Sequence, residues 1–476
     1  MRRGYLLIIT LLISSLACGF ISTATPVPTP NNLPTQGIST KVPTDTPGVE
    51  PVSSQTPSAE VTTTPTQEKP TKTPYPTSVL DAQLTNEINL IQSQVIEERG
   101  LQPKHPVPFV LLSTDQLRQN VISDYNANHT DKEISDELLQ YSILGLVDPG
   151  LDLHTLEIDL QSEQIAGYYD TETAEMFVVQ GEGFQGPERL TFSHEYTHVL
   201  QDQNYDIEHG LKMNDATCEA DSEYCAAVQA LIEGDATVSE FVWLYYYATT
   251  QDKDQVDAFN NSLKTPIFDS APAFMRDDLL FPYSQGSTFV MEFINNGGWS
   301  AVDALYHNPP VSTEQILHSS LYPSDTPVKV DLPDLTTPLG AGWREVAHNQ
   351  MGEWYTYLIL ARGINENARL DDTTAQAAAA GWGGDEYMVL HNDETNASAF
   401  VMKTIWDTTK DASEFASGLE KYANTRFEVT ATQQADTLTW SYSDGYSSLY
   451  LSGDTTIWMI TPDSTTAQTI TGLVLP

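Results

Sequence analysis

Three residues suited to metal chemistry, His194, Glu195 and His198, lie together in the segment 191–200. Four residues are just over one helical turn, so the two imidazoles lie on one helix face and can bind one cation. Neutral imidazole nitrogens suit zinc. Glu195 follows the first histidine, where it could take a proton from a metal-bound water. The alternative is an amphipathic helix with two surface histidines. We favour zinc, because burying a carboxylate between two histidines without a metal or another partner is costly.

A catalytic zinc ion usually has three protein ligands, and Glu233 is the candidate for the third. It lies in a long helix predicted over residues 222–249, and Gly234 beside it lets another backbone come close. The alternative is an acid on the solvated face of that helix. The aromatic run 241–247 leaves little solvated face, so the pattern favours Glu233 as a ligand.

These motifs together resemble the gluzincin clan of zinc peptidases, which includes thermolysin and the zinc aminopeptidases. The resemblance rests on H-E-x-x-H at 194–198, E-G-x-A at 233–236 and P-Y-x-x-G at 282–286. It implies one zinc ion per chain, bound by His194, His198 and Glu233. It also implies that Glu195 is the general base on a zinc-bound water and that Tyr283 donates to the oxyanion. The alternative for Tyr283 is an amphipathic core tyrosine.

The sequence departs from this clan at several positions. No G-x-M-E-N-like segment occurs, so the resemblance predicts an endopeptidase rather than an aminopeptidase. Asp202 stands where thermolysin has an aspartate, and it either orients part of the site or is a solvated acid at a helix end. Asp235 is assigned only a supporting or structural role. His318 could donate a proton to the leaving amine, but a surface histidine is the favoured interpretation.

Two other interpretations of the function remain open. The first is a binding or scaffold lipoprotein whose metallopeptidase fold binds metal but no longer cleaves peptides. The intact Glu195 weighs against it, because an inactive descendant has no need of the base. The second is a structural protein without zinc, which metal analysis would exclude.

The N-terminus resembles an export signal, because a basic start precedes the 13-residue apolar run 5–17, which is too short to span a bilayer. Residues 15–18 resemble a bacterial lipobox, with Ser15 where leucine is usual. We therefore expect a signal peptide over 1–18 and a lipidated Cys18 that anchors the chain to the outer face of a bacterial membrane. A plain cleaved signal is the alternative. The Pro/Thr/Ser-rich stretch 19–77 is expected to be a disordered tether, or else a cleaved pro-segment or glycosylated stalk.

Composition limits the partners. The chain has 22 Lys+Arg against 65 Asp+Glu, a net charge of −43, which argues against nucleic acid and against electrostatic docking on anionic lipid. The expected partner is a peptide or protein substrate. If Cys18 carries lipid, Cys218 and Cys225 remain as a pair that could form a disulfide in an oxidising compartment, with two free thiols as the alternative.

The predicted fold class is α+β in two units. Residues 78–335 are expected to form a zincin-like catalytic domain, mostly helical with a small edge-strand sheet, and residues 336–476 an α+β module. A hairpin predicted over 164–170 and 174–179 precedes the H-E-x-x-H helix. It is either purely structural or an edge that pairs with an extended peptide substrate.

Several further elements are expected downstream of the long helix. We predict helices over 287–296, 343–361, 373–380 and 411–422, and a turn at the Gly-rich segment 381–384. Alternating apolar residues predict strands over 387–390, 399–405, 438–442, 447–451 and 456–460.

Overall fold

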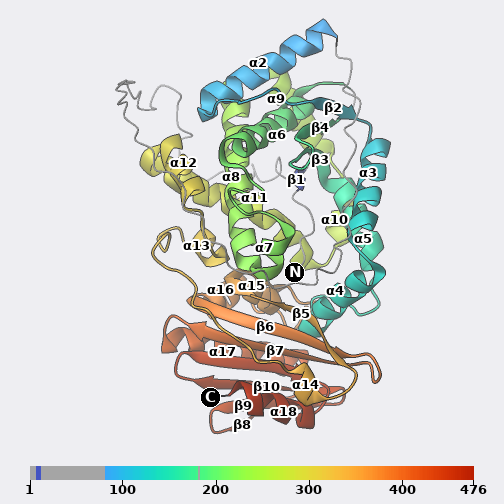
Figure 1. Cartoon of the computed structure of the whole chain (residues 1–476), viewed down its shortest axis with the longest axis vertical. Helices are drawn as coiled ribbons and strands as arrows, with labels where there is room; N and C mark the ends of the chain where they lie inside the picture. The colour runs from blue at the N-terminus through green and yellow to red at the C-terminus, as the bar shows by residue number, and fades with distance from the viewer. Residues whose placement is uncertain (1–6, 12–80, 181–182, 476) are drawn as a thin grey trace, which may run out of the picture.

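The computed structural model of the chain describes residues 7–11, 81–180 and 183–475. The predicted Cys18 and the 19–77 tether therefore lie outside the described residues. The fold is α+β, as predicted: a mainly helical unit is followed along the chain by a unit built on a sheet (Figure 1). No helix of the described ranges is long and apolar enough to cross a membrane.

The helical unit begins with elements that lie across one end and along one side of the central helices (Figure 1). These elements are α2 (Ala82–Arg99), β2 (Phe109–Leu112), α3 (Thr114–Asn128), α4 (Asp131–Leu144) and α5 (Leu153–Gln164). The helices α3 and α4 start at capping boxes built on Ser113 and Thr130, which satisfy two free backbone N–H groups each.

Three long helices form the centre of this unit: α6 (Gly186–Tyr205), α8 (Ser222–Tyr246) and α11 (Ala273–Gly297). The shorter helices between and after them are α7 (Asp215–Ala220), α9 (Thr250–Ser262), α10 (Pro266–Ser270), α12 (Trp299–His307) and α13 (Thr313–Leu317). Cys218 of α7 and Cys225 of α8 form a disulfide, with an S–S distance of 2.07 Å.

A four-stranded sheet lies against α6. The strand order is β1-β3-β4-β2, in which β3 (Ile165–Asp170) and β4 (Glu175–Val179) form the predicted hairpin and β2 runs parallel to β4. The outer edge of β3 pairs antiparallel with β1 (Leu7–Leu11), a part of the apolar run near the N-terminus. The sheet therefore places β3 between a hairpin partner and an added extended segment.

The helix predicted over 287–296 is much longer in the structure. It is α11, which begins at Ala273 and carries Pro282 inside it. Proline usually ends or kinks a helix because it lacks an N–H donor. Here Phe274 and Phe281, both buried in the main core, fix the preceding turns by packing, which outweighs the local preference.

The second unit is a seven-stranded antiparallel sheet in the order β5-β6-β7-β11-β10-β9-β8. Its elements are α14 (Thr336–Leu339), β5 (Trp343–Asn349), α15 (Gly352–Arg362), α16 (Asp372–Ala379), β6 (Trp382–Asn392), β7 (Ala397–Trp406), α17 (Thr409–Arg426), β8 (Thr432–Gln434), β9 (Thr437–Tyr442), β10 (Gly445–Ser452), β11 (Thr455–Thr461) and α18 (Ser464–Val474).

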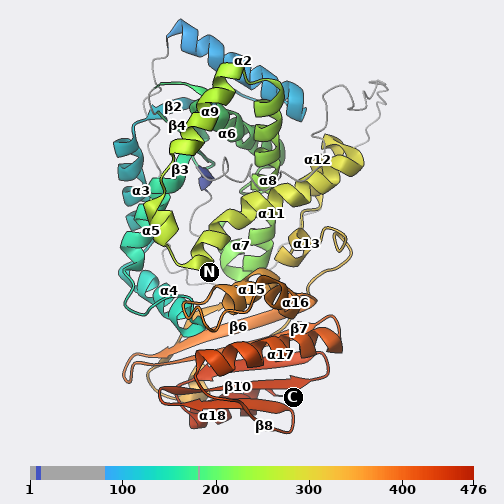
Figure 2. The ribbon, with the colours of Figure 1, turned by 180° about the vertical axis from the view of Figure 1, so that it is seen from behind.

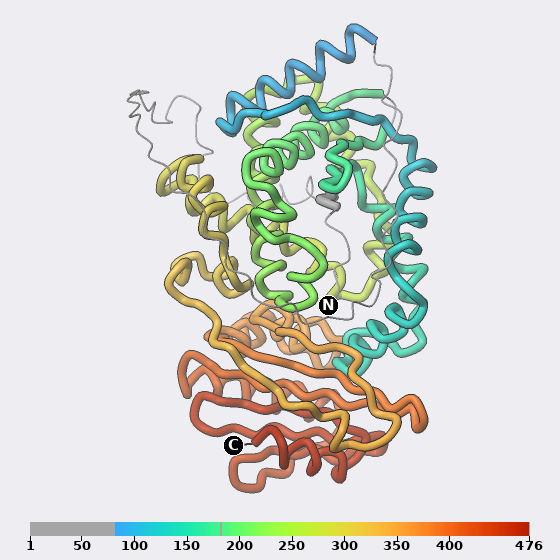
Figure 3. The backbone as a smooth tube through the Cα atoms, viewed as in Figure 1, coloured from blue at the N-terminus to red at the C-terminus, as the bar shows by residue number. Residues whose placement is uncertain are grey.

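Both faces of this sheet are covered. Along β6, Tyr387 and Val389 belong to the core that includes α17, whereas Met388 and Leu390 belong to the core that includes α18. Figure 2 shows α17 lying across one face. The segment 318–335 runs from the helical unit along the sheet unit, where the N–H of Val328 donates to the carbonyl of Gly383 (Figure 3).

Two predictions in this unit are wrong. The first half of the predicted helix 343–361 is strand β5, because pairing with the open edge of β6 satisfies its backbone, and the helix starts only at Gly352. The segment 381–384, predicted as a turn, supplies the start of β6 from Trp382 onward.

Candidate metal centre

The structure brings the three predicted ligands together. His194 and His198 project from α6 toward Glu233 on α8, and their Nε2 atoms lie 3.2 and 3.4 Å from its Oε2. One ligand atom from each residue lies within 4.8 Å of the other two, and all three side chains are almost completely buried. Two imidazole nitrogens and one carboxylate oxygen are the donor set of a catalytic zinc site.

The electrostatics of the group also fit a cation. Burial raises the pKa of Glu233, but His198 and His194 outweigh it, so the net pKa is lowered and the carboxylate is ionised. Nε2 of His198 is buried and makes no hydrogen bond of good geometry. The residues present therefore offer one negative charge and an imidazole lone pair to a common point.

The far side of His198 is fixed by an amide. Nε2 of Gln201 donates to the carbonyl of Ile232 at 3.0 Å, which can only accept, so this contact fixes the orientation of the amide. Oε1 of Gln201 then faces Nδ1 of His198 at 2.8 Å and must accept a proton from it. The tautomer that results leaves the Nε2 lone pair directed at Glu233, as metal binding requires.

The far side of His194 is fixed by a carboxylate. Its Nδ1 lies 2.9 Å from Oε2 of Glu240, which is 1% exposed. Burial lowers the pKa of His194, but the contacts with Glu233 and Glu240 outweigh burial and raise the pKa to about 10. A carboxylate behind a metal-binding histidine orients the ring and increases its basicity.

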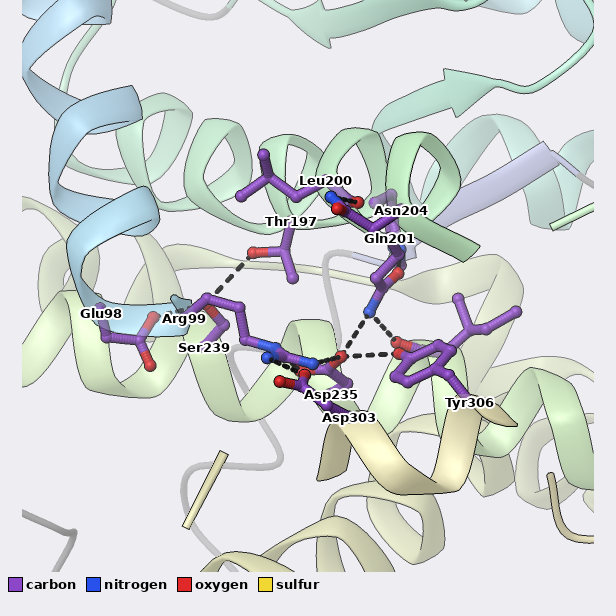
Figure 4. Close-up of polar contacts among 12 residues, drawn as sticks. Glu98, Arg99, Thr197, Leu200, Gln201, Asn204, Asp235, Ser239, Asp303 and Tyr306 are labelled. Atoms are coloured by element: carbon purple, nitrogen blue, oxygen red, sulfur yellow. Dashed lines mark hydrogen bonds and ion pairs between the residues drawn. The ribbon is translucent and has the colours of Figure 1, made fainter. Parts of the chain in front are cut away.

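A charged network connects Gln201 to residues of α2, α8 and α12 (Figure 4). Gln201 Nε2 also donates to Oδ2 of Asp235 at 3.1 Å, and the same carboxylate accepts from Arg99 at 2.7 Å and from the Tyr306 hydroxyl at 2.6 Å. Arg99 is fully buried and pairs a second time with Asp303. Asp235 has the supporting role predicted for it, because it bonds to the amide that orients His198.

Two motif glycines explain how Tyr283 reaches the ligands. A Cβ on Gly234 would lie 2.2 Å from the backbone of Gly286, and a Cβ on Gly286 would lie 2.0 Å from the carbonyl oxygen of Ala230. Only hydrogen fits at both positions, so α8 and α11 cross in backbone contact. Tyr283 lies about one helical turn before Gly286, so this contact places it beside the three predicted ligands.

Tyr283 is 4% exposed, and its ring centroid lies 6.3 Å from that of His194. Burial raises the pKa of its hydroxyl well above the ordinary range, and Glu233 and Glu195 raise it further. The hydroxyl is therefore a stable donor among carboxylates.

Glu195 lies where α6 meets the sheet. A Cβ on Gly167 of β3 would lie 3.2 Å from Cγ of Glu195 and 2.7 Å from Cγ2 of Thr191, so the absence of a side chain lets the strand approach the helix. A pocket of about 250 Å³ opens beside this contact. Its lining is largely apolar and includes Ile165, Leu190, Val256 and Phe259, together with Glu240.

Two other candidates lie outside the centre. Asp202 accepts from the Tyr169 hydroxyl at 2.8 Å and from the N–H of Ile207, so it fixes the end of α6 to β3. His318 is partly exposed and pairs with Glu353 of α15 at 2.9 Å. This is the surface-facing role that the sequence favoured.

The sequence prediction missed three contributors to the centre. Glu240 lies seven residues after Glu233, two helical turns on, and Gln201 lies three residues after His198, so helical spacing could have indicated both. Arg99 comes from a separate helix far earlier in the chain, and no local pattern marks it.

Comparison with known proteins adds one match. A family model described as a domain of unknown function (DUF8575) matches residues 338–471, which lie in the sheet-based unit and do not include the metal group. No curated protein and no solved structure matches the chain.

Proposed function

We propose that this protein is a zinc-dependent endopeptidase of gluzincin type that acts at the cell exterior, tethered through a lipidated Cys18. The observation that supports this most is the convergence of His194, His198 and Glu233, with Glu195 and Tyr283 at the same buried point. Burying two histidines beside the carboxylates of Glu195, Glu233 and Glu240 costs a helix bundle free energy unless the cluster binds a ligand.

The role of each side chain follows from its position. When bound, zinc supplies Lewis acidity, which polarises a carbonyl and lowers the pKa of water. The Glu195 carboxylate accepts the proton of the attacking water and delivers it to the leaving nitrogen. The Tyr283 hydroxyl donates to the oxyanion of the tetrahedral intermediate, where one such donor is typically worth about 2.7 to 4 kcal/mol.

The sheet favours an extended peptide as the substrate. Gly167 keeps β3 within contact distance of Glu195, and the outer edge of β3 pairs antiparallel with the extended segment Leu7–Leu11. A strand added to this edge uses backbone hydrogen bonds, which any peptide sequence offers. The adjacent pocket, mainly apolar, would then select the side chains that fit it.

The experiment uses Glu195→Gln, which removes the base and keeps the shape. Wild type should hold one zinc per chain and cleave members of a broad peptide library. The variant should keep its zinc and fold but lose turnover by at least about 10²-fold.

A parallel Glu233→Gln variant should lose zinc, as measured by metal analysis of the same preparations. Zinc-loaded wild type that cleaves no peptide would instead support the binding or scaffold alternative. Equal zinc in wild type and Glu233→Gln would remove Glu233 from the ligand set.

A further inference from the structure

A second group of acidic side chains lies where the two units meet. It consists of Glu314 of α13, Asp325 of the connecting segment and Asp407 at the turn between β7 and α17. One carboxylate oxygen from each lies within 4.8 Å of the other two. Three negative side chains from separate parts of the chain are therefore held close together.

Glu314 carries the unusual feature of this group. The residue is only 3% exposed, and its Oε1 is buried without a hydrogen-bond partner. Among the described residues no lysine, arginine or histidine forms an ion pair with Glu314, Asp325 or Asp407. A buried acceptor directed at other carboxylates costs free energy unless a proton or a cation neutralises it.

We propose that Glu314, Asp325 and Asp407 form a calcium site that joins the helical unit to the sheet unit. This proposal is independent of zinc and of peptide hydrolysis, because it uses none of the residues of the metal centre.

The chemistry of the ligands selects the ion. Hard oxygen donors suit Ca²⁺ and Mg²⁺ rather than zinc, which prefers nitrogen and sulfur ligands. Ca²⁺–oxygen bonds of about 2.3 to 2.6 Å let ligands on opposite sides of the ion lie up to about 5 Å apart, whereas Mg²⁺ at about 2.1 Å allows only about 4.2 Å. Ca²⁺ also accepts six to eight oxygen ligands in a flexible geometry, which suits side chains that come from three separate segments of the chain. Asp407 is exposed and Asp325 is partly exposed, which leaves room for waters to complete the shell.

The surrounding contacts hold the three ligands in place without neutralising them. Gln315, next to Glu314, donates through its side-chain amide to the carbonyl of Asp325. The N–H of Asp407 donates to the carbonyl of Gly381 at 2.9 Å. Each contact fixes a backbone and leaves the carboxylates for a ligand.

The electrostatic state of Glu314 agrees with this arrangement. Burial raises its pKa, and the carboxylates of Glu353, Asp407 and Asp325 raise it further, to about 9. A cation held by the three carboxylates would relieve this repulsion.

The test measures thermal unfolding of the zinc-loaded protein in calcium-free buffer and with added CaCl₂, together with calcium binding by calorimetry. Wild type should bind one Ca²⁺ and melt at a higher temperature when the ion is present. Glu314→Gln should bind calcium at least about 10-fold more weakly, because affinity depends on ligand charge. Its zinc content should not change.

The same variant gives a second, opposite signature. In calcium-free buffer, Glu314→Gln should melt no lower than wild type, since it removes an acid that is grouped with two other carboxylates, whereas with saturating calcium it should melt lower. Asp407→Asn, at an exposed position that does not threaten folding, should also weaken calcium binding. Asp257→Asn, an exposed acid on α9, is the matched control and should retain full binding.

Three results would overturn the proposal. They are a melting temperature of wild type that does not respond to calcium, equal binding by wild type and Glu314→Gln, or equal binding by wild type and Asp407→Asn. The first two results would show that Glu314 is not a calcium ligand, and the third would remove Asp407 from the ligand set. None of these results bears on whether the zinc centre cleaves peptides.

Discussion

Glu233 and Glu314 are the same kind of side chain with nearly the same burial, at 1% and 3% exposure, yet their environments have opposite effects. Burial raises the pKa of both. At Glu233 two histidines outweigh that effect and the pKa is lowered, whereas at Glu314 neighbouring carboxylates add to it and the pKa rises to about 9. Burial alone therefore does not reveal what a carboxylate does; the charges that face it decide.

The two regions also differ in what lies behind the donors. Each histidine at the first centre has a partner on its far nitrogen, Glu240 or Gln201, which fixes its ring. The second group is positioned by contacts to backbone carbonyls, which come from the side-chain amide of Gln315 and the N–H of Asp407. Oriented rings suit chemistry, which needs precise geometry, whereas flexible oxygen ligands suit a structural Ca²⁺ ion.

Of the substitutions that distinguish a catalytic centre from a structural ion site, Tyr283→Phe should have the largest effect, and that effect should be on kcat. Tyr283→Phe removes one donor and keeps the ring. If the hydroxyl meets the oxyanion, kcat should fall on the order of 10²- to 10³-fold with little change in KM, because the interaction exists only in the transition state. Steady-state kinetics on a cleavable peptide measures both constants.

The matched control is Tyr387→Phe, a buried tyrosine of the sheet-based unit whose hydroxyl accepts from Gln140 at 3.0 Å. It should lower the melting temperature slightly and leave kcat unchanged. An unchanged kcat in Tyr283→Phe with zinc still bound would show that Tyr283 is a core residue.

The first of these two regions could largely be predicted from the sequence, because the relevant patterns are local. The i, i+4 spacing predicted that His194 and His198 lie on one helix face, and E-G-x-A lies in the long helix predicted over 222–249, which is α8 in the structure. P-Y-x-x-G was expected to precede a helix over 287–296, whereas α11 contains it. The hairpin before α6 and the alternating strands of the second unit followed from period-two patterns, and the structure contains them.

The rest depends on contacts between distant segments. Pro282 misled the prediction of α11, since packing of Phe281 in the core outweighs a local helix signal. Strand β5 exists because β6 offers it an edge. Asp325 and Asp407 come together with Glu314 only through the folding of two units, so no spacing in the sequence marks that group.

A smaller effect is expected at Glu240, which contacts Nδ1 of His194 and has no part in the proposed reaction. Glu240→Gln should weaken zinc binding by about 10- to 100-fold, because partners behind a metal-binding histidine contribute that much. A competition titration with a chelator measures the affinity, and the melting temperature of the metal-free protein should change little.

Glu98→Gln is the control for this substitution, since Glu98 is also buried but bonds to Ser239 and contacts neither histidine. Its zinc affinity should match wild type. Equal affinity in Glu240→Gln and wild type would mean that α6 alone orients His194.

Substitution of Glu223, which lies at the junction of the two units, should affect the metal centre least and should instead change how stability depends on pH. Its Oε2 accepts from the N–H and the hydroxyl of Thr313, both at 2.8 Å, and it is 4% exposed. Burial raises its pKa from 4.5 to about 8; the two contacts from Thr313 lower it, and Asp385 and Asp221 raise it. Glu223 thus resembles Glu314 rather than Glu233, but with donors that satisfy it.

The sign of the pH effect follows from this raised pKa. Between pH 4.5 and about 8 the folded protein holds the Glu223 proton and the unfolded chain releases it. The free energy of unfolding therefore falls as pH rises through this window and levels off above it.

Glu223→Gln should remove this contribution to the slope of unfolding free energy against pH, while keeping an acceptor for Thr313. The melting temperature should change by about 2 to 4 °C for each kcal/mol. Melting curves from pH 5 to 8.5 measure it, with Glu292→Gln, an exposed acid on α11, as the control that should keep the wild-type slope. A Glu223→Gln slope equal to that of wild type would show that the carboxylate is ionised in the fold, and the contrast between acids faced by cations and acids faced by other acids would then not extend to this junction.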